Sequence, residues 1–403
     1  MLSPKSFLFK EEESMARFLR IFALFLCVCV CFAALAPAAL AEPLEQGTPM
    51  TLTAPSAILM EAETGAVIFE KNADERRPAA SVNKLMTLLI VLEKLDQGAF
   101  TLEDKITVSP AAAAQPGSQA FLDAHAVYPL KDLLKATIIA SANDAAAALA
   151  EYTAGTEEAF ATLMNEKAAA LGLENSRYVN CTGLPAEGQY TCARDVAVLS
   201  REVAKHPAYF TYSSTWLDNL THPSGRVTDL TNTNRLVRFY KDCDGMKTGS
   251  TNEAKYCLSA TAQRNGMRLI AVVLGVPNSQ TRFDEARAML DYGFSAYALT
   301  PVAREGDWIG MQVPVKLGSK DQVDAALGAG LSLLLRSGMK DQLSFEAELP
   351  EYVTAPVQAG DSLGTVWVLL SGKRIAQLPA VAAQDVRLPG MLEGFMRLFE
   401  NWR

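Results

Sequence analysis

The chain has 403 residues, of which 49% are hydrophobic and 20% are charged, and its formal net charge at pH 7 is −8. This length and composition are typical of a globular protein with two or more domains and an ample hydrophobic core. The charge is acidic and no basic stretch could follow a phosphate backbone, so nucleic acid is excluded as an expected partner.

The N-terminal segment is predicted to be a signal peptide. Arg17 and Arg20 precede an apolar run over residues 21–35, and Ala39 and Ala41 provide the small residues of an A-x-A cleavage site. The run is short for a membrane-spanning helix. We therefore expect residues 1–41 to be removed and the mature protein to be exported; a retained N-terminal anchor is the alternative.

The first elements predicted for the mature chain are a β-hairpin and a long helix. The pattern over residues 56–70 favours a hairpin with its turn near Thr64–Gly65. A long apolar pattern begins at Ser81 and continues to about Leu95, which predicts a helix. Further helices are predicted over 130–139, 144–153, 157–171 and 284–292. A strand-rich stretch is predicted to begin at Lys247, with strands over 256–262 and 268–276. Strands at both ends of a helical cluster predict an α+β domain with an antiparallel sheet.

A change of composition near residues 298–301 marks the expected start of a second domain. Short alternating strands separated by turns predict a small all-β domain over residues 299–385. Residues 386–403 then place apolar and aromatic side chains on one face of a helix. Such an amphipathic helix can lie in a membrane interface. A helix packed on the β domain is the alternative.

Three short polar motifs follow one another along the chain: Ser81–Lys84 (SVNK), Ser141–Asn143 (SAN) and Lys247–Gly249 (KTG). Each motif alone is weak, since residues 337–340 (SGMK) also fit the pattern S-x-x-K. That second copy lies after the K-T-G, whereas Ser81 begins a long apolar helix. The order, spacing and flanking residues together make the set specific.

These motifs can build an acyl-transfer site that needs no histidine. A serine hydroxyl is a poor nucleophile without a base within hydrogen-bond reach. Ser81 and Lys84 are three residues apart, so on a helix they share one face. Lys84 can act as the base if burial or a nearby positive charge lowers its pKa. Lys247 is a candidate source of that charge, and Ser141 can relay the proton.

With these motifs the chain resembles the serine-type D-alanyl-D-alanine carboxypeptidases, which are low-molecular-mass penicillin-binding proteins. The likeness extends over about residues 54–297, and residues 244–254 (DGMKTGSTNEA) closely resemble the sequence typical of the family. Two departures are visible. Asn83 stands where relatives usually carry threonine, and Gln189 stands where many carry histidine.

The resemblance implies a penicillin-recognising, β-lactamase-like catalytic domain over residues 42–298. It implies that Ser81 attacks the carbonyl of the penultimate D-alanine of a peptidoglycan stem peptide, with Lys84 as base. Ser141 would protonate the leaving D-alanine. Substrate binding is expected from Asn143, Lys247, Thr248, Gly249, Ser250 and Arg282, with the backbone N–H groups of Ser81 and Ser250 as oxyanion hole. A surface ion pair is the alternative for Arg282.

The same resemblance suggests partners and a location. Peptidoglycan stem peptides are the expected substrates in cell wall biogenesis, and β-lactams are expected as covalent inhibitors. The protein is expected at the extracytoplasmic face of the cytoplasmic membrane, which it would touch through the C-terminal helix. No metal or organic cofactor is implied. Four cysteines follow the signal peptide, and either disulfides or buried free thiols are possible for Cys181, Cys192, Cys243 and Cys257.

Other functions share part of this pattern. Class A β-lactamases add a glutamate and an asparagine, E-x-x-x-N, that activate the deacylating water. No asparagine between Ser141 and Lys247 has a glutamate four residues before it. A non-enzymatic wall-binding protein on this scaffold would be expected to have lost motif residues, and all are present. A carboxypeptidase is therefore favoured, with an endopeptidase of the same chemistry left open.

Overall fold

The computed structural model describes residues 50–391 and residue 393. The predicted signal peptide and most of the predicted C-terminal helix lie outside the described residues. The described start of that helix differs from the prediction, because residues 386–390 are not helical and Val386 forms an antiparallel β-bridge with Val357. Two compact units are present. Among the described residues, the larger unit contains residues 50–302 together with Ser332–Asp341, and the smaller unit contains Ala303–Leu331 and the described residues from Gln342 onward.

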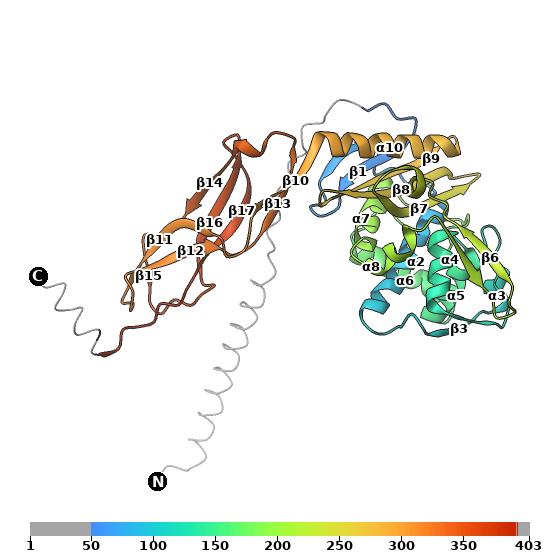
Figure 1. Cartoon of the computed structure of the whole chain (residues 1–403), viewed down its shortest axis with the longest axis horizontal. Helices are drawn as coiled ribbons and strands as arrows, with labels where there is room; N and C mark the ends of the chain where they lie inside the picture. Colours follow the sequence, from blue (N-terminus) through green and yellow to red (C-terminus); the bar gives the residue numbers. More distant parts are fainter. Residues whose placement is uncertain (1–49, 392, 394–403) are drawn as a thin grey trace, which may run out of the picture. The chain divides into compact units, whose positions relative to one another are not determined.

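A five-stranded antiparallel sheet lies at the centre of the larger unit (Figure 1), with the strand order β2-β1-β9-β8-β7. Its strands are β1 (Ser56–Glu61), β2 (Val67–Lys71), β7 (Cys243–Thr251), β8 (Lys255–Arg264) and β9 (Met267–Val276). The predicted hairpin at the start of the unit is confirmed as β1–β2. Because β1 pairs with β9, strands from both ends of the unit's sequence meet in one sheet. Strand β7 pairs only with β8 among the described strands, so it forms one edge of the sheet.

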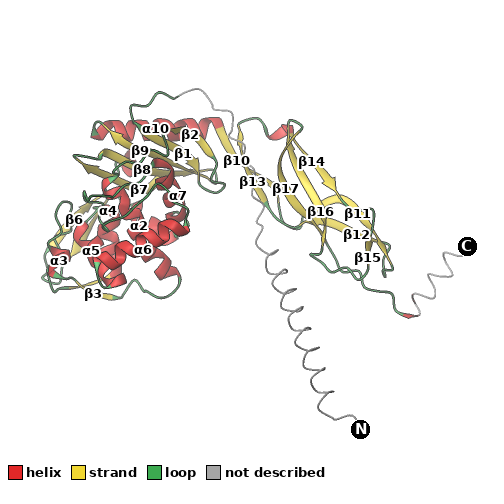
Figure 2. Ribbon diagram, turned by 180° about the vertical axis from the view of Figure 1, so that it is seen from behind, coloured by secondary structure: helices red, strands yellow, loops and turns green. Residues whose placement is uncertain are grey.

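Helices cover both faces of this sheet (Figure 2). On one face α10 (Ser279–Ala296) packs against β8 and β9. On the other face α7 (Ala193–Val203) packs against β1 and β9, and α2 (Lys84–Asp96) packs against α7. The remaining helices are α3 (Pro110–Ala113), α4 (Leu130–Ile139), α5 (Asn143–Ala154), α6 (Glu157–Ala170), α8 (Pro207–Ser213) and α9 (Leu236–Phe239). Two small hairpins are formed by β3 (Lys105–Thr107) with β4 (Val127–Pro129) and by β5 (Leu217–Thr221) with β6 (Val227–Thr231). The predicted α+β architecture is confirmed.

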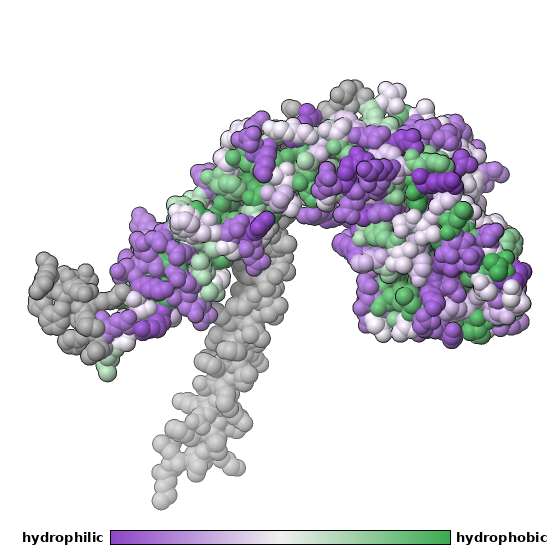
Figure 3. Space-filling view, in the orientation of Figure 1, coloured by the Kyte–Doolittle hydropathy of each residue, from purple (hydrophilic) through white to green (hydrophobic). Residues whose placement is uncertain are grey.

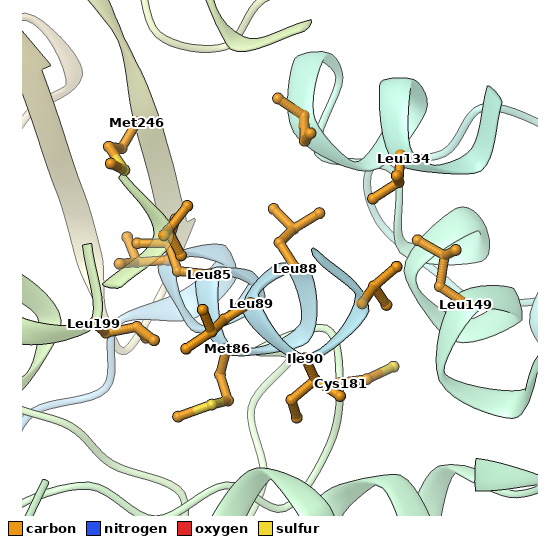
Figure 4. Close-up of a cluster of buried hydrophobic side chains, with 14 of the residues drawn as sticks. Leu85, Met86, Leu88, Leu89, Ile90, Leu134, Leu149, Cys181, Leu199 and Met246 are labelled. Carbon is orange, nitrogen blue, oxygen red and sulfur yellow. The ribbon is translucent and has the colours of Figure 1, made fainter. Parts of the chain in front are cut away.

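Helix α2 runs through the core of the larger unit. Its nine residues from Lys84 to Leu92 are all buried, as expected for a helix that is enclosed on every side. Figure 4 shows Leu88 of α2 among side chains contributed by α4, α5, α7 and β7. Apolar residues also occur on the surface in Figure 3, interspersed among polar ones, which is normal for a folded domain. The packing around α2 fixes the position of its first residue, Lys84, which is the last residue of the S-x-x-K motif.

The structure differs from the sequence-based prediction in two details near the motifs. Residues Ala80–Asn83 form a 3-10 turn, and the α-helix begins only at Lys84. Ser81 therefore lies in the turn that leads into α2. The K-T-G motif does not begin a strand but lies inside β7. Neither α7 nor the β5–β6 hairpin is among the elements predicted from the sequence.

The smaller unit contains a six-stranded sheet in the order β14-β16-β17-β12-β11-β15. Its strands are β11 (Trp308–Lys316), β12 (Gln322–Leu327), β14 (Leu343–Glu348), β15 (Val353–Thr354), β16 (Ser362–Leu370) and β17 (Lys373–Ala382). The predicted all-β character of this region is confirmed. One segment inside the predicted range is different. Strand β13 (Leu331–Arg336) pairs with β10 (Tyr297–Ala303), and Leu334 packs in the core of the larger unit.

Two further features concern the expected location and the cysteines. Within the described part of the chain, every helix is too short or too polar to cross a membrane. The four cysteines of this part are free and buried. Of the two alternatives left by the sequence, the structure therefore contains buried thiols rather than disulfides.

Shortening a side chain in the core around α2 should destabilise the larger unit. Leu89 is 0% exposed, so Leu89→Ala should lower the free energy of unfolding by about 2–5 kcal/mol, because apolar contacts are lost and a cavity remains. The matched control is Leu217→Ala on β5, where the side chain is 60% exposed and the loss should stay below about 1 kcal/mol. Urea unfolding followed by circular dichroism measures both. Equal losses would contradict this core.

Candidate active site

The S-x-x-K motif places a serine and a lysine in direct contact. Nζ of Lys84 donates a hydrogen bond to Oγ of Ser81 at 2.8 Å and another to the backbone oxygen of Thr182 at 2.7 Å. Ser81 is half-buried, whereas Lys84 is fully buried. A neutral amine in this position can accept the proton of the serine hydroxyl, because the two groups are already within hydrogen-bond reach.

The burial of Lys84 makes its neutral form accessible at physiological pH. Burial lowers the pKa of Lys84 from 10.5 to about 7, while the charged forms of Cys181 and Asp144 act in the opposite direction. The sequence analysis offers burial or the charge of Lys247 as the source of such a shift. In the structure burial is the cause, and Lys84 needs no neighbouring cation to become a base near neutral pH.

Close backbone packing surrounds the turn that carries Ser81. Ala80 has a φ of 50°, in the left-handed region where residues other than glycine are uncommon. A Cβ atom on Gly183 would lie 2.0 Å from the backbone oxygen of Ala80. A Cβ atom on Gly249 would lie 2.3 Å from the oxygen of Ala79 and 3.0 Å from the nitrogen of Ser81. Only glycine therefore allows the loop at 183 and strand β7 to approach this turn so closely.

The S-x-N motif connects α4 to α5, as predicted. Ser141 is buried with a φ of 61°, and its Oγ has no hydrogen-bond partner among the described residues. Asn143 begins α5, and its Nδ2 donates a hydrogen bond of 2.5 Å to the backbone oxygen of Pro116. Its Oδ1 likewise has no partner in this part of the chain. Buried polar atoms without partners are uncommon, and they are typical of sites that a ligand or water completes.

Asp144 is a residue of this site region to which the sequence analysis assigns no role. Its carboxylate accepts hydrogen bonds from the backbone N–H groups of Ala120 and Leu122, both at 3.0 Å. It also accepts one from Ala145 at 2.9 Å, in the first turn of α5. These bonds fix the loop before β4 next to Asn143. The sequence does offer one signal for this residue: an acidic side chain in the first turn of a predicted helix interacts favourably with the helix dipole.

The K-T-G motif occupies the edge strand β7. Lys247 is 1% exposed, and burial together with the positive charges of Lys84 and Arg282 holds its pKa well below the ordinary value. Oγ1 of Thr248 donates a hydrogen bond of 2.8 Å to Oγ1 of Thr233. Ser250 is exposed at the end of the motif. A bound anion would favour the charged form of Lys247, because an opposite charge nearby raises the pKa of an amine.

Arg282 lies on α10 and contacts the same strand. Its Nη1 donates hydrogen bonds to the backbone oxygens of Gly249 at 3.2 Å and Cys257 at 3.4 Å. Its guanidinium lies over the rings of Phe283 and Tyr256, at 4.7 and 5.3 Å from their centroids. Burial lowers its pKa to about 10. At 8% exposure it is not the surface ion pair that the sequence leaves as an alternative.

The structure thus brings most of the predicted residues into one region, although not all of them touch. Ser81 and Lys84 share a hydrogen bond, and Gly249 abuts the nitrogen of Ser81. Lys84 is close enough to Lys247 for its positive charge to lower the pKa of Lys247. Ser141, by contrast, is linked to neither Ser81 nor Lys84 by a hydrogen bond in the described structure. Its part in proton transfer stays a prediction.

Comparison with known proteins finds relatives that match most of the chain. Residues 43–278 match the family described as D-alanyl-D-alanine carboxypeptidase, and residues 297–387 match the C-terminal domain of penicillin-binding protein 5. The chain is 38% identical to the D-alanyl-D-alanine carboxypeptidase DacF of Bacillus subtilis, over 87% of this chain and 90% of the relative. It is 34% identical to DacC of Escherichia coli, over 87% and 91% of the two chains. Among solved structures, penicillin-binding protein 5 of Haemophilus influenzae superposes with a TM-score of 0.75 at 30% identity, over 84% of this chain and 99% of that one.

The lowered pKa of Lys84 leads to a prediction that can be measured directly. In protein labelled with ¹⁵N-lysine, the Nζ signal of Lys84 should titrate with a midpoint near pH 7, so that the neutral amine predominates above it. An ordinary lysine stays protonated to about pH 10. Lys84→Met should remove the signal that titrates near pH 7. Lys247→Met should leave that signal in place and remove only the separate lowered titration of Lys247 itself. A midpoint above about pH 9 would show that the buried amine stays charged.

Proposed function

Because this chain belongs to the D-alanyl-D-alanine carboxypeptidase family, we propose that Ser81 is the nucleophile of a two-step acyl transfer on peptidoglycan stem peptides. Members of the family act on peptidoglycan peptides and bind β-lactams. The observation that carries the proposal is the hydrogen bond of 2.8 Å between Oγ of Ser81 and Nζ of the buried Lys84. It supplies a nucleophile and a base without a histidine.

In the first step, Oγ of Ser81 attacks the carbonyl carbon of the penultimate D-alanine while neutral Lys84 takes the hydroxyl proton. The peptide bond breaks, the terminal D-alanine leaves with a proton delivered through Ser141, and the remaining peptide stays attached as an ester. Water then hydrolyses the ester and restores the serine. The lowered pKa of Lys84 supports this role, since acylation should become faster as the pH rises through about 7.

The negative charge that develops on the substrate carbonyl requires donors in the transition state. We assign this role to the backbone N–H groups of Ser81 and Ser250. The close approach of Gly249 to the nitrogen of Ser81 supports the assignment, because it brings the end of β7 next to the nucleophile. A Cβ atom at position 249 would force the two backbones apart.

We assign the binding of the terminal carboxylate to Lys247 and Thr248. Arg282, which donates a hydrogen bond to the backbone oxygen of Gly249, is assigned to the same subsite. The positive charges of Lys84 and Arg282 lower the pKa of Lys247, and a bound carboxylate would offset this effect, which supports the assignment. Asn143, whose Oδ1 has no partner among the described residues, is assigned to the amide backbone of the substrate. A polar atom of this kind gains most from a ligand that restores its hydrogen bond.

For the remainder of the chain we propose the domain limits and location expected from the sequence. Residues 42–298 form the catalytic domain and 299–385 the β domain. Residues 1–41 direct export, and 386–403 bind the membrane surface. The protein would then act at the extracytoplasmic face of the cytoplasmic membrane. The family's action on peptidoglycan peptides supports this location, since that substrate lies outside the cytoplasm.

Replacing the nucleophile should abolish both expected activities. Ser81→Ala should reduce D-alanine release from a diacyl-Lys-D-Ala-D-Ala peptide by more than about 1,000-fold and remove covalent labelling by a fluorescent penicillin. Ser337→Ala, which alters the other S-x-x-K serine, should retain both. In the unaltered protein, penicillin should block release. Labelling that survives in Ser81→Ala would place the nucleophile elsewhere.

Removing the C-terminal tail should separate membrane binding from catalysis. A mature protein that lacks residues 388–403 should remain in the supernatant after sedimentation with phospholipid vesicles, whereas the full mature chain should sediment with them. D-alanine release from a soluble peptide should be the same for the two proteins. Sedimentation of the truncated protein would show that the tail is not the anchor.

A further inference from the structure

We propose that a pocket beside the nucleophile turn is a subsite for a side chain that ends in an ammonium group, on the stem-peptide residue preceding the two D-alanines. This inference rests on the proposed function and adds a basis for substrate choice. The pocket has a volume of about 110 Å³, which is room for a group several times larger than a water molecule.

Three parts of the chain form the walls of this pocket. One wall is the turn that leads to Ser81, with Pro78–Ala80 and Asn83. The second is the loop over residues 183–189, which also approaches that turn through Gly183. The third is formed by Thr251 and Glu253, which follow the K-T-G strand. The pocket thus combines the turn that carries Ser81, the 183–189 loop and the end of β7.

The direction of the bound peptide follows from the proposed roles along β7. A carboxylate at Lys247 and Thr248, with the scissile carbonyl at Ser250, requires the peptide to run antiparallel to the strand. Each residue of an extended chain advances by about 3.3 Å. The residue before the two D-alanines therefore lies beside Thr251, where the pocket is located. Its side chain is the part of the substrate that can enter.

Asn83 gives the pocket an acceptor without a donor. The residue is 3% exposed and lines the pocket, and its Oδ1 has no hydrogen-bond partner in the described structure. An unpaired buried oxygen is costly unless a ligand or water supplies the missing hydrogen.

Glu253 gives the pocket its charge. It is exposed, and within residues 50–391 no hydrogen bond or ion pair engages its carboxylate. The other walls are largely prolines and alanines, and none of the lining residues is basic. An apolar channel with one acid at its rim suits an alkyl chain that ends in an ammonium group, because the chain packs while the charge pairs.

Gln189 does not compete for this ligand. Its Oε1 accepts from the backbone N–H of Val179 at 3.0 Å, and its Nε2 donates to the backbone oxygen of Leu184 at 2.8 Å. The side chain is therefore committed to the shape of the loop. The wall that it supports is fixed before any substrate binds. Asn83 and Glu253 are therefore the groups that we expect to contact the ammonium group of the substrate.

The test compares two peptides that differ in one charge: Nα-acetyl-Lys-D-Ala-D-Ala, with a free ε-amine, and Nα,Nε-diacetyl-Lys-D-Ala-D-Ala. The unaltered mature protein should cleave the free-amine peptide with a kcat/KM about five- to tenfold higher, through a lower KM. Glu253→Gln should reduce this preference to less than about twofold and leave kcat for the diacetyl peptide unchanged. Asn83→Thr should weaken the preference independently.

The matched control is Glu166→Gln, which removes the charge of an exposed acid on α6 and should keep the full preference. Equal kcat/KM values for the two peptides in the unaltered protein would overturn the subsite and show that the pocket holds only water. A preference that survives Glu253→Gln, or that Glu166→Gln also abolishes, would overturn it too. Failure to release D-alanine from either peptide would instead refute the proposed function, and the subsite with it.

Discussion

Burial of the Lys84 amine is the constraint on which the arrangement around Ser81 depends. A charged amine inside a protein loses its hydration, so it either finds polar partners or gives up its proton. Here the amine has two partners, the hydroxyl of Ser81 and the backbone oxygen of Thr182. The position of the amine is fixed, because the helix that begins at Lys84 is enclosed by the core of the larger unit.

Because α2 is enclosed by the core, Ser81 lies in a 3-10 turn just before the helix, and two glycines from other segments pack against that turn. The serine must be near enough to the lysine to share its proton and yet accessible to a peptide. A turn that emerges from the core meets both requirements, since Ser81 is half-buried while the residues after it are buried. Gly183 and Gly249 then let a loop and the edge of a sheet come within contact of that turn. Electrostatics adds a second feature, because burial and the neighbouring charges of Lys84 and Arg282 hold the pKa of Lys247 well below its ordinary value.

Local patterns in the sequence predict the elements whose signals are complete within a few residues. Helix α4 has the predicted bounds, and the β1–β2 hairpin follows from alternation around Thr64–Gly65. Helix α7 is absent from the prediction although its sequence contains a helical pattern, since Val196, Leu199 and Val203 lie on one helical face and are buried. The 3-10 turn at Ala80–Asn83 has no side-chain cap, so the sequence does not distinguish it from the helix that follows.

The site is predictable to a similar extent. The motifs identify Ser81 and Lys84 because their contact spans a single turn, and the structure contains that contact. The role of Asp144 depends on backbone groups more than twenty residues earlier in the chain, which no local pattern reveals. The same is true of the pocket at Asn83 and Glu253, whose walls come from three separate segments. Folding, rather than spacing, brings these residues together.

The position of β7 at the edge of the sheet has a consequence for the solubility of the protein. An unpaired strand is a template for other chains, and proteins usually block such edges to avoid aggregation. Here the turn at Ala79–Ser81 packs against Gly249 and covers part of the edge. A loop that covers an edge strand makes it a poorer template for a strand from a second folded molecule. The packing that positions Ser81 therefore also limits self-association of the protein.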